Sequence, residues 1–156
     1  MKVFLDGCRR IETLSAEIYQ RLAVDADYAP EVRSTFHRLS NDERSHAREI
    51  DLLLQATAQE LAAAVKIPLS EIEVAVQAAE NIVRVLDRMR LNEEEALQLA
   101  VQMEEQFVKV HAGNAVHFSN PRIAALFETL SRHDQEHLDA LRQCLAWWHA
   151  EHKARR

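Results

Sequence analysis

The sequence is poor in the residues that interrupt helices, with two glycines and three prolines among 156 residues. Because these residues supply most tight turns and are poor helix formers, their scarcity leaves little material for a fold of many short strands. Ala, Leu, Glu, Gln, Arg and Val dominate instead, and this composition favours helix. We therefore predict an all-α fold, and the length is that of a single domain spanning residues 1–156.

Long apolar runs and an excess of positive charge are also missing. No apolar stretch approaches the length of a membrane span, so we expect no membrane partner. The formal net charge of −6 argues against a nucleic-acid partner, and the basic end at 152–156 is expected to be a solvated tail. The N-terminus carries no convincing secretory signal, which favours a cytoplasmic location.

Cysteine is scarce as well, since only Cys8 and Cys144 occur. Two cysteines so far apart make neither a zinc knuckle nor a disulfide framework. We expect both thiols to be free and buried, without a disulfide between them.

Apolar residues recur every three or four positions along five stretches, which is the period of an amphipathic helix. Asn92 with Glu95, and Ser70 with Glu73, form the pattern of a capping box at two of the predicted starts. The middle stretch is about 30 Å long at ~1.5 Å per residue, enough to carry the chain from one end of a bundle to the other. The predicted helices are 3–24, 31–64, 70–90 (the crossover helix), 93–117 and 121–152.

Two of these stretches carry an acidic residue followed three positions later by histidine. Glu43 and His46 would leave one face of a helix as neighbours, and this pairing is half of a metal site. A single such pair is more often a surface feature. Here a second copy, Asp134 and His137, follows after a shift of 91 residues.

The surrounding residues repeat with the pairs. The same shift aligns Phe36 with Phe127, and a shift of 92 aligns Glu12 with Glu104 and Tyr19 with His111. Both glutamates lie on the apolar stripe of their helices, where a charge calls for a partner. The chain therefore reads as two similar helical hairpins joined by a crossover helix.

The order Glu12, Glu43-x-x-His46, Glu104, Asp134-x-x-His137 resembles the ferritin-like superfamily, in its rubrerythrin branch. The resemblance covers nearly the whole chain. It implies a ferritin-like four-helix bundle of two hairpins with an additional crossover helix, and a centre of two metal ions. The metal ligands it implies are Glu12, Glu43, His46, Glu104, Asp134 and His137.

The sequence departs from that family at a few positions. Asp134 stands where a glutamate is usual, and His111 replaces a second tyrosine. Val101 and Phe107 occupy the places where rubrerythrins proper often have a further glutamate. The chain also has no Cys-x-x-Cys segment to deliver electrons, so an external electron donor would be needed.

Four of the six implied ligands are carboxylates, which would repel one another and take up protons if they were buried together without cations. Two divalent cations would cancel this charge and leave the two histidines as neutral ligands. Carboxylate with imidazole suits iron, with manganese or zinc as alternatives. We expect Glu43 and Asp134 to bridge the ions, while Glu12 and Glu104 each hold one.

The remaining polar residues have less specific interpretations. Tyr19 and His111 are either core residues with satisfied polar tips or partners of Glu12 and Glu104. Of Trp147 and Trp148, one is expected to pack inside, and the other could mark the contact of a homodimer. Outward or surface positions are predicted for Glu17, Glu105, Glu136, His37, His117 and His133.

Three functions remain open at this point. The first is a di-iron oxidoreductase that reduces peroxide or O₂, or oxidises Fe(II), with an external electron donor. The second is iron storage or delivery without turnover. The third is a metal-free helical module that binds a partner through its polar face, so the sequence alone leaves open whether the chain is an enzyme.

Overall fold

The structure is a computed structural model that describes residues 2–56, 69–115, 118 and 120–154. The described residues confirm the predicted all-α fold. The predicted helix ends at 64 and 117 lie outside them. The helices are α1 Lys2–Ala23, α2 Pro30–Ala56, α3 Ser70–Leu86, α4 Glu93–Ala115 and α5 Pro121–Ala154.

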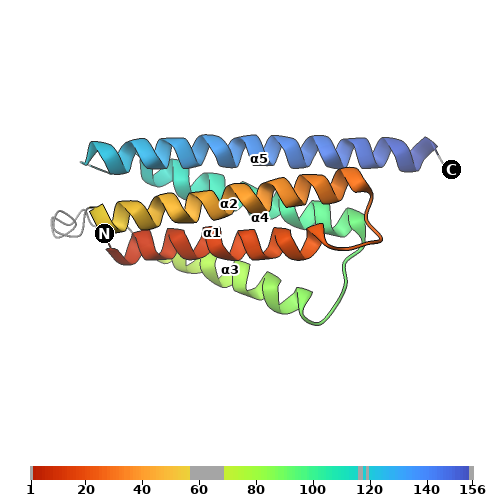
Figure 1. The fold of residues 1–156 in the computed structure, drawn as a ribbon, viewed down its shortest axis with the longest axis horizontal. Helices are drawn as coiled ribbons and strands as arrows, with labels where there is room; N and C mark the ends of the chain where they lie inside the picture. Colours follow the sequence, from red (N-terminus) through yellow and green to blue (C-terminus); the bar gives the residue numbers. More distant parts are fainter. Residues whose placement is uncertain (1, 57–68, 116–117, 119, 155–156) are drawn as a thin grey trace.

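The helices form a ferritin-like bundle of two hairpins (Figure 1). The helix α1 packs mainly on α2, α4 packs mainly on α5, and contacts between α2 and α5 join the hairpins. The helices α1 and α5 run in one direction, and α2 and α4 run in the other. Among the described residues, no helix is long and apolar enough to cross a membrane.

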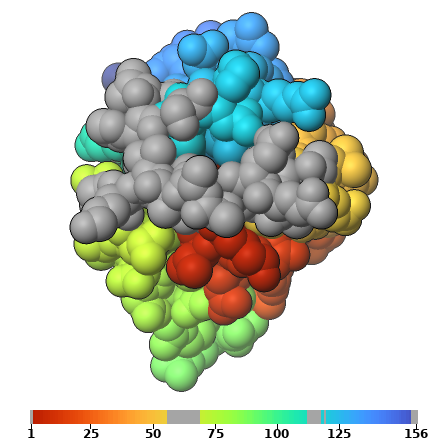
Figure 2. All heavy atoms as spheres, turned by 90° about the vertical axis from the view of Figure 1, so that its left-hand side faces the viewer, coloured from red at the N-terminus to blue at the C-terminus, as the bar shows by residue number. Residues whose placement is uncertain are grey.

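The helix α3 lies outside the four-helix core, against α1. Viewed from the end where α1 begins, α3 and α5 lie on opposite sides of the molecule, with α1 between them (Figure 2). The helix α3 runs in the same direction as α1 and returns the chain to the end where α4 begins. Because of this path, α1 and α4, which are the first helices of the two hairpins, run antiparallel to each other.

Side chains cap the starts of α4 and α5, and the cap of α4 is one that the sequence predicts. Asn92 and Glu95 exchange side-chain to backbone hydrogen bonds, as a capping box requires, and Asn120 accepts hydrogen bonds from two backbone N–H groups of α5. The capping box predicted at Ser70 is wrong. The N-cap residue of α3 is Leu69, and it makes no side-chain cap hydrogen bond.

The predicted crossover helix ends earlier than expected, at Leu86. The chain beyond it is held by contacts with the turn between α1 and α2, where Arg90 pairs with Asp25 and the Tyr28 hydroxyl donates to the Leu91 carbonyl. Partners more than sixty residues away along the chain therefore decide where the helix stops. The apolar periodicity of residues 70–90 contains no information about such contacts.

Gly7 marks the closest approach of α1 to α3. A Cβ atom at this position would lie 2.4 Å from Cγ2 of Ile72, well inside van der Waals contact. We expect Gly7→Ala to destabilise the protein, because overpacking costs about 1–3 kcal/mol and the gain in helix propensity returns only about 1 kcal/mol. Urea unfolding measures the difference.

The matched background for this test is Ile72→Ala, which removes the opposing atom. There the same glycine substitution should be neutral or stabilising, because only the propensity gain remains. An equal cost in both backgrounds would show that α3 does not press on α1 at this point.

Aromatic layers enclose the middle of the bundle. On one side Phe4, Phe118 and Phe127 form a cluster in which each ring contacts the other two, with centroids 4.8–5.7 Å apart. On the other side Phe36 stacks on Tyr19 at 6.0 Å. Cys8 and Cys144 are free and buried, as predicted. The polar residues of the repeat lie between these apolar layers.

Candidate metal centre

Four helices bring the six predicted ligands into the interior. The helices α1 and α4 contribute one glutamate each, and α2 and α5 each contribute an acidic residue and a histidine one turn apart. None of the six is more than 3% exposed, although each is ionisable, so they face one another across the core and not the solvent. They are Glu12, Glu43, His46, Glu104, Asp134 and His137.

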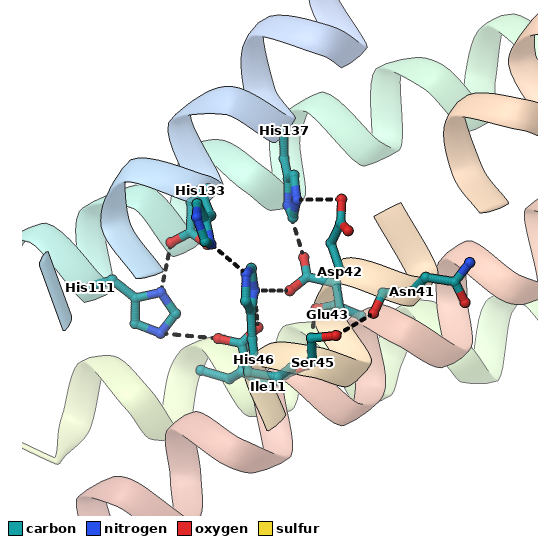
Figure 3. Close-up of polar contacts among 12 residues, drawn as sticks. Ile11, Asn41, Asp42, Glu43, Ser45, His46, His111, His133 and His137 are labelled. Atoms are coloured by element: carbon teal, nitrogen blue, oxygen red, sulfur yellow. Dashed lines mark hydrogen bonds and ion pairs between the residues drawn. The ribbon is translucent and has the colours of Figure 1, made fainter. Parts of the chain in front are cut away.

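Five of these residues form two groups with the spacing of metal ligands. One group is Glu12, Glu43 and His46, and the other is Glu43, Glu104 and His137, with ligand atoms within 4.8 Å of one another in each group. Glu43 belongs to both. Its Oε2 lies 2.9 Å from Nδ1 of His46, and its Oε1 lies 3.3 Å from Nδ1 of His137 (Figure 3). One carboxylate thus faces two adjacent sites with one oxygen each.

Asp134 occupies a different position from Glu43. In the described part of the chain it belongs to neither group of three, and its Oδ2 accepts a hydrogen bond of 2.6 Å from Nδ1 of His111. It is one methylene shorter than the glutamate usual in the resembling family. That Asp134 bridges the ions therefore stays a prediction.

Tyr19 and His111 lie beside the two glutamates contributed by α1 and α4. The Tyr19 hydroxyl donates a hydrogen bond of 2.5 Å to Oε1 of Glu104. In the second hairpin, Nε2 of His111 lies 3.4 Å from Oε1 of Glu12. The internal repeat therefore places each of these side chains against the glutamate of the opposite hairpin.

The Nε2 atoms of His46 and His137 contact residues outside the predicted ligand set. Nε2 of His46 shares a hydrogen bond of 2.9 Å with Nδ1 of His133, and Nε2 of His137 lies 3.5 Å from Asp42 (Figure 3). Asp42 and His133 are equivalent under the shift of 91 residues, each directly preceding an acidic residue of the site. That equivalence is the signal by which both could have been found.

Without a cation, protons compensate the buried charge. Burial, followed by the neighbouring Glu43 carboxylate, raises the pKa of Glu12 to about 7, and burial also raises that of Glu104. Burial alone would lower the pKa of His46, but hydrogen bonds to Glu12 and Glu43 outweigh it and raise the pKa to about 10. Glu104 and Glu43 outweigh the burial of His137 in the same way and raise its pKa to about 11.

Several polar atoms of this centre are left without partners. A buried acceptor or donor without a hydrogen bond costs about 1–3 kcal/mol, and more when the group is charged. Oxygen and imidazole nitrogen atoms in such a cluster are suitable ligands for divalent iron, manganese or zinc, so the residues fit a pair of cations. Among the described residues, those without a hydrogen-bond partner in this centre are Glu12 Oε1, Glu104 Oε2, His111 Nε2 and His137 Nδ1.

A polar cavity of about 210 Å³ between α2 and α5 reaches the outer edges of His46 and His137. Its lining also includes Arg38, Asp42 and Glu136. A larger cavity of about 520 Å³ lies between α3 and α4, away from the centre, and its walls are mostly apolar. Of these two cavities, the smaller one offers an approach to the candidate metal centre.

Comparison with known proteins identifies a family for this chain. The family model of Rubrerythrin matches residues 4–145, which is most of the chain. No curated protein and no solved structure matches it significantly.

Proposed function

Because the chain belongs to the rubrerythrin family, we propose that it is a di-iron carboxylate protein that reduces peroxide or O₂, or oxidises Fe(II). Manganese or zinc is the alternative occupant. The observation that supports this proposal most strongly is the position of Glu43, whose two oxygens face two different groups of ligands. A single shared carboxylate between two sites is what a pair of metal ions requires.

In this proposal the buried polar residues of the candidate metal centre have defined roles. Glu43 would hold both ions, with His46 and Glu12 completing one site and His137 and Glu104 completing the other. Asp134 belongs to the same centre through His111. Iron, when bound, supplies the exchange of electrons with the oxidant.

The surroundings determine which substrates can enter. Burial of the carboxylates keeps water away, and the cavity beside His46 and His137 has room for a molecule as small as peroxide or O₂.

The experiment that tests this function is anaerobic loading with Fe(II), followed by separate additions of peroxide and of O₂ with absorbance recorded. We expect about two ions per chain, oxidation of the iron, and faster consumption of the preferred oxidant. The matched pair of variants is Glu104→Gln and Glu105→Gln. These neighbours differ in exposure, since Glu104 is buried, whereas the side chain of Glu105 is 42% exposed in an ion pair with Arg142.

In this test the Glu105→Gln variant should behave as the wild type, whereas Glu104→Gln should lose metal and oxidation. Equal behaviour of the two variants, or fewer than one ion per chain after full loading, would refute the proposal. Loss of metal in both variants would point to a non-specific acidic surface.

Iron storage or delivery without turnover is the second candidate. The acidic residues Asp42, Glu49 and Glu136 in the cavity lining favour the passage of cations. A cage-like assembly in light scattering, with more than two iron ions per chain, would support storage. A metal-free interaction module would instead show no change in melting on chelation.

A homodimer in the cytoplasm completes the proposal. Trp147 and Trp148 are both partly buried at the edge of the core, and Trp148 donates a hydrogen bond to Glu93. Trp147 is therefore the better candidate for a dimer contact. Sedimentation of the wild type and of Trp147→Ala tests the dimer, and fractionation of cells tests the location.

A further inference from the structure

His111 and Asp134 form a pair that the two groups of metal ligands do not include. Both side chains are no more than 1% exposed, and Nδ1 of His111 donates to Oδ2 of Asp134 at 2.6 Å. The opposite nitrogen of the same ring, Nε2, has no hydrogen-bond partner among the described residues. A buried imidazole oriented by a carboxylate on one nitrogen and unpartnered on the other is in the arrangement of a metal ligand.

The unpartnered nitrogen is directed at the centre. It lies 3.4 Å from Oε1 of Glu12, an atom that also has no hydrogen-bond partner in the described chain. In Figure 3, dashed lines run from the His111 ring to two different carboxylates, one from each ring nitrogen. Two ligand atoms that each lie about 2.1 Å from one ion are roughly 3.0–3.4 Å apart. The two atoms therefore have the separation of neighbours around one ion.

A neutral imidazole with its proton on Nδ1 presents a lone pair at Nε2. A lone pair facing a carboxylate oxygen at this distance is repulsive unless a positive charge lies between or beside them. Either a second proton on the ring or a metal ion can supply that charge. Glu12 is part of a group of three candidate ligands, and its other oxygen, Oε2, lies 3.4 Å from Nδ1 of His46, so one carboxylate faces both rings.

We infer that His111 is a metal ligand through Nε2, and that Asp134 positions this imidazole and does not bridge the ions. The inference rests on the proposed di-metal function. It makes the two sites unequal, because Glu12, Glu43, His46 and His111 then surround one ion with two oxygens and two nitrogens. At the equivalent place beside the other ion, the Tyr19 hydroxyl donates to Glu104 and offers no ligand atom.

The thiol of Cys8 also contacts His111, and burial raises its pKa. The charged and titratable groups around His111 are thus Glu12, Asp134 and Cys8.

The decisive experiment uses Co(II) alone, added anaerobically to the full chain. Coordinated histidines in a Co(II) protein show their remaining ring N–H as a strongly shifted proton signal that disappears in D₂O. We expect three such signals in the wild type, from His46, His137 and His111. His111→Gln should remove one signal and weaken the binding of one of the two ions by at least about 10–100-fold.

Further variants separate the possible outcomes. Asp134→Asn should keep all three signals but move that of His111 and weaken the same ion, whereas the exposed His37→Gln should change nothing. Two bound ions with only two signals, and unchanged affinity in His111→Gln, would overturn the inference and leave the proposed function standing. A chain that binds no Co(II) would overturn both. If His111→Gln does not fold, the signals of the wild type and of Asp134→Asn decide the question.

Discussion

Replacing Glu43 with glutamine is expected to lower the metal content from about two ions per chain to fewer than one, a larger loss than any other single ligand should cause. Both oxygens of this carboxylate are in use, at 2.9 Å from Nδ1 of His46 and 3.3 Å from Nδ1 of His137. Glutamine has one oxygen, and its NH₂ group would turn a donor toward one of the cations. The carboxylates that remain in the variant no longer balance the charge of two divalent ions.

Metal analysis after equilibrium dialysis measures this effect. Glu12→Gln and Glu104→Gln should each cost about one ion, because each residue belongs to one group only. Glu105→Gln should cost none, because Glu105 belongs to neither group and pairs with Arg142. Retention of two ions by the Glu43 variant would show that this carboxylate does not link the sites.

The stability of this variant without metal has to be measured separately, because Glu43 has opposing effects in the metal-free protein. Its carboxylate raises the pKa of Glu12, so these two groups repel each other when both are ionised. The same carboxylate raises the pKa of His46 and of His137, so glutamine also removes favourable contacts with two protonated rings. A metal-free variant that still unfolds cooperatively would separate loss of a ligand from loss of the fold.

The positions of the helices could be predicted from the sequence because their signals are local. Apolar residues at spacings of three and four mark the buried stripes, and Asn92 with Glu95 fixes one start within a few residues. The end of α3 escaped prediction because Arg90 pairs with Asp25, which is distant in sequence. The false capping box at Ser70 matched a pattern that four residues satisfy easily by chance.

The residues of the centre could be predicted because the repeat carries them on the apolar face. Charged residues on a buried stripe need a common explanation, and the shifts of 91 and 92 residues supplied one. The contacts of Asp134 and His133 could not be predicted in this way. They depend on the length of one side chain and on which ring nitrogen faces which neighbour, and a helical period contains neither.

Chelation should make the stability of the protein fall steeply as the pH rises above neutrality. In the folded metal-free protein the pKa of His46 is about 10 and that of His137 about 11, against an ordinary value of 6.5. From about pH 6.5 to pH 10 the folded chain therefore holds protons that the unfolded chain releases. Each such proton lowers the free energy of unfolding by about 1.4 kcal/mol per pH unit.

Glu12 also loses its contribution to stability as the pH rises, but it does so at lower pH. Its pKa of about 7 lies above the ordinary 4.5, so its contribution is lost between about pH 4.5 and pH 7. Urea unfolding with a chelator at about pH 6.5, 8 and 9.5 should consequently show a loss of several kcal/mol. His46 faces Glu12, Glu43, His133 and His137. In His46→Gln the free energy of unfolding should therefore fall less steeply with pH, by the contribution of about one proton.

Metal loading should remove this decline or reverse it. The ions bind deprotonated ligands, so they displace the stored protons and bind more tightly as the pH rises. Binding to the folded state alone then stabilises it increasingly over the range in which the chelated protein weakens. The two stability curves should separate with increasing pH, and parallel curves would mean that the cations and these protons do not compete for the same buried side chains.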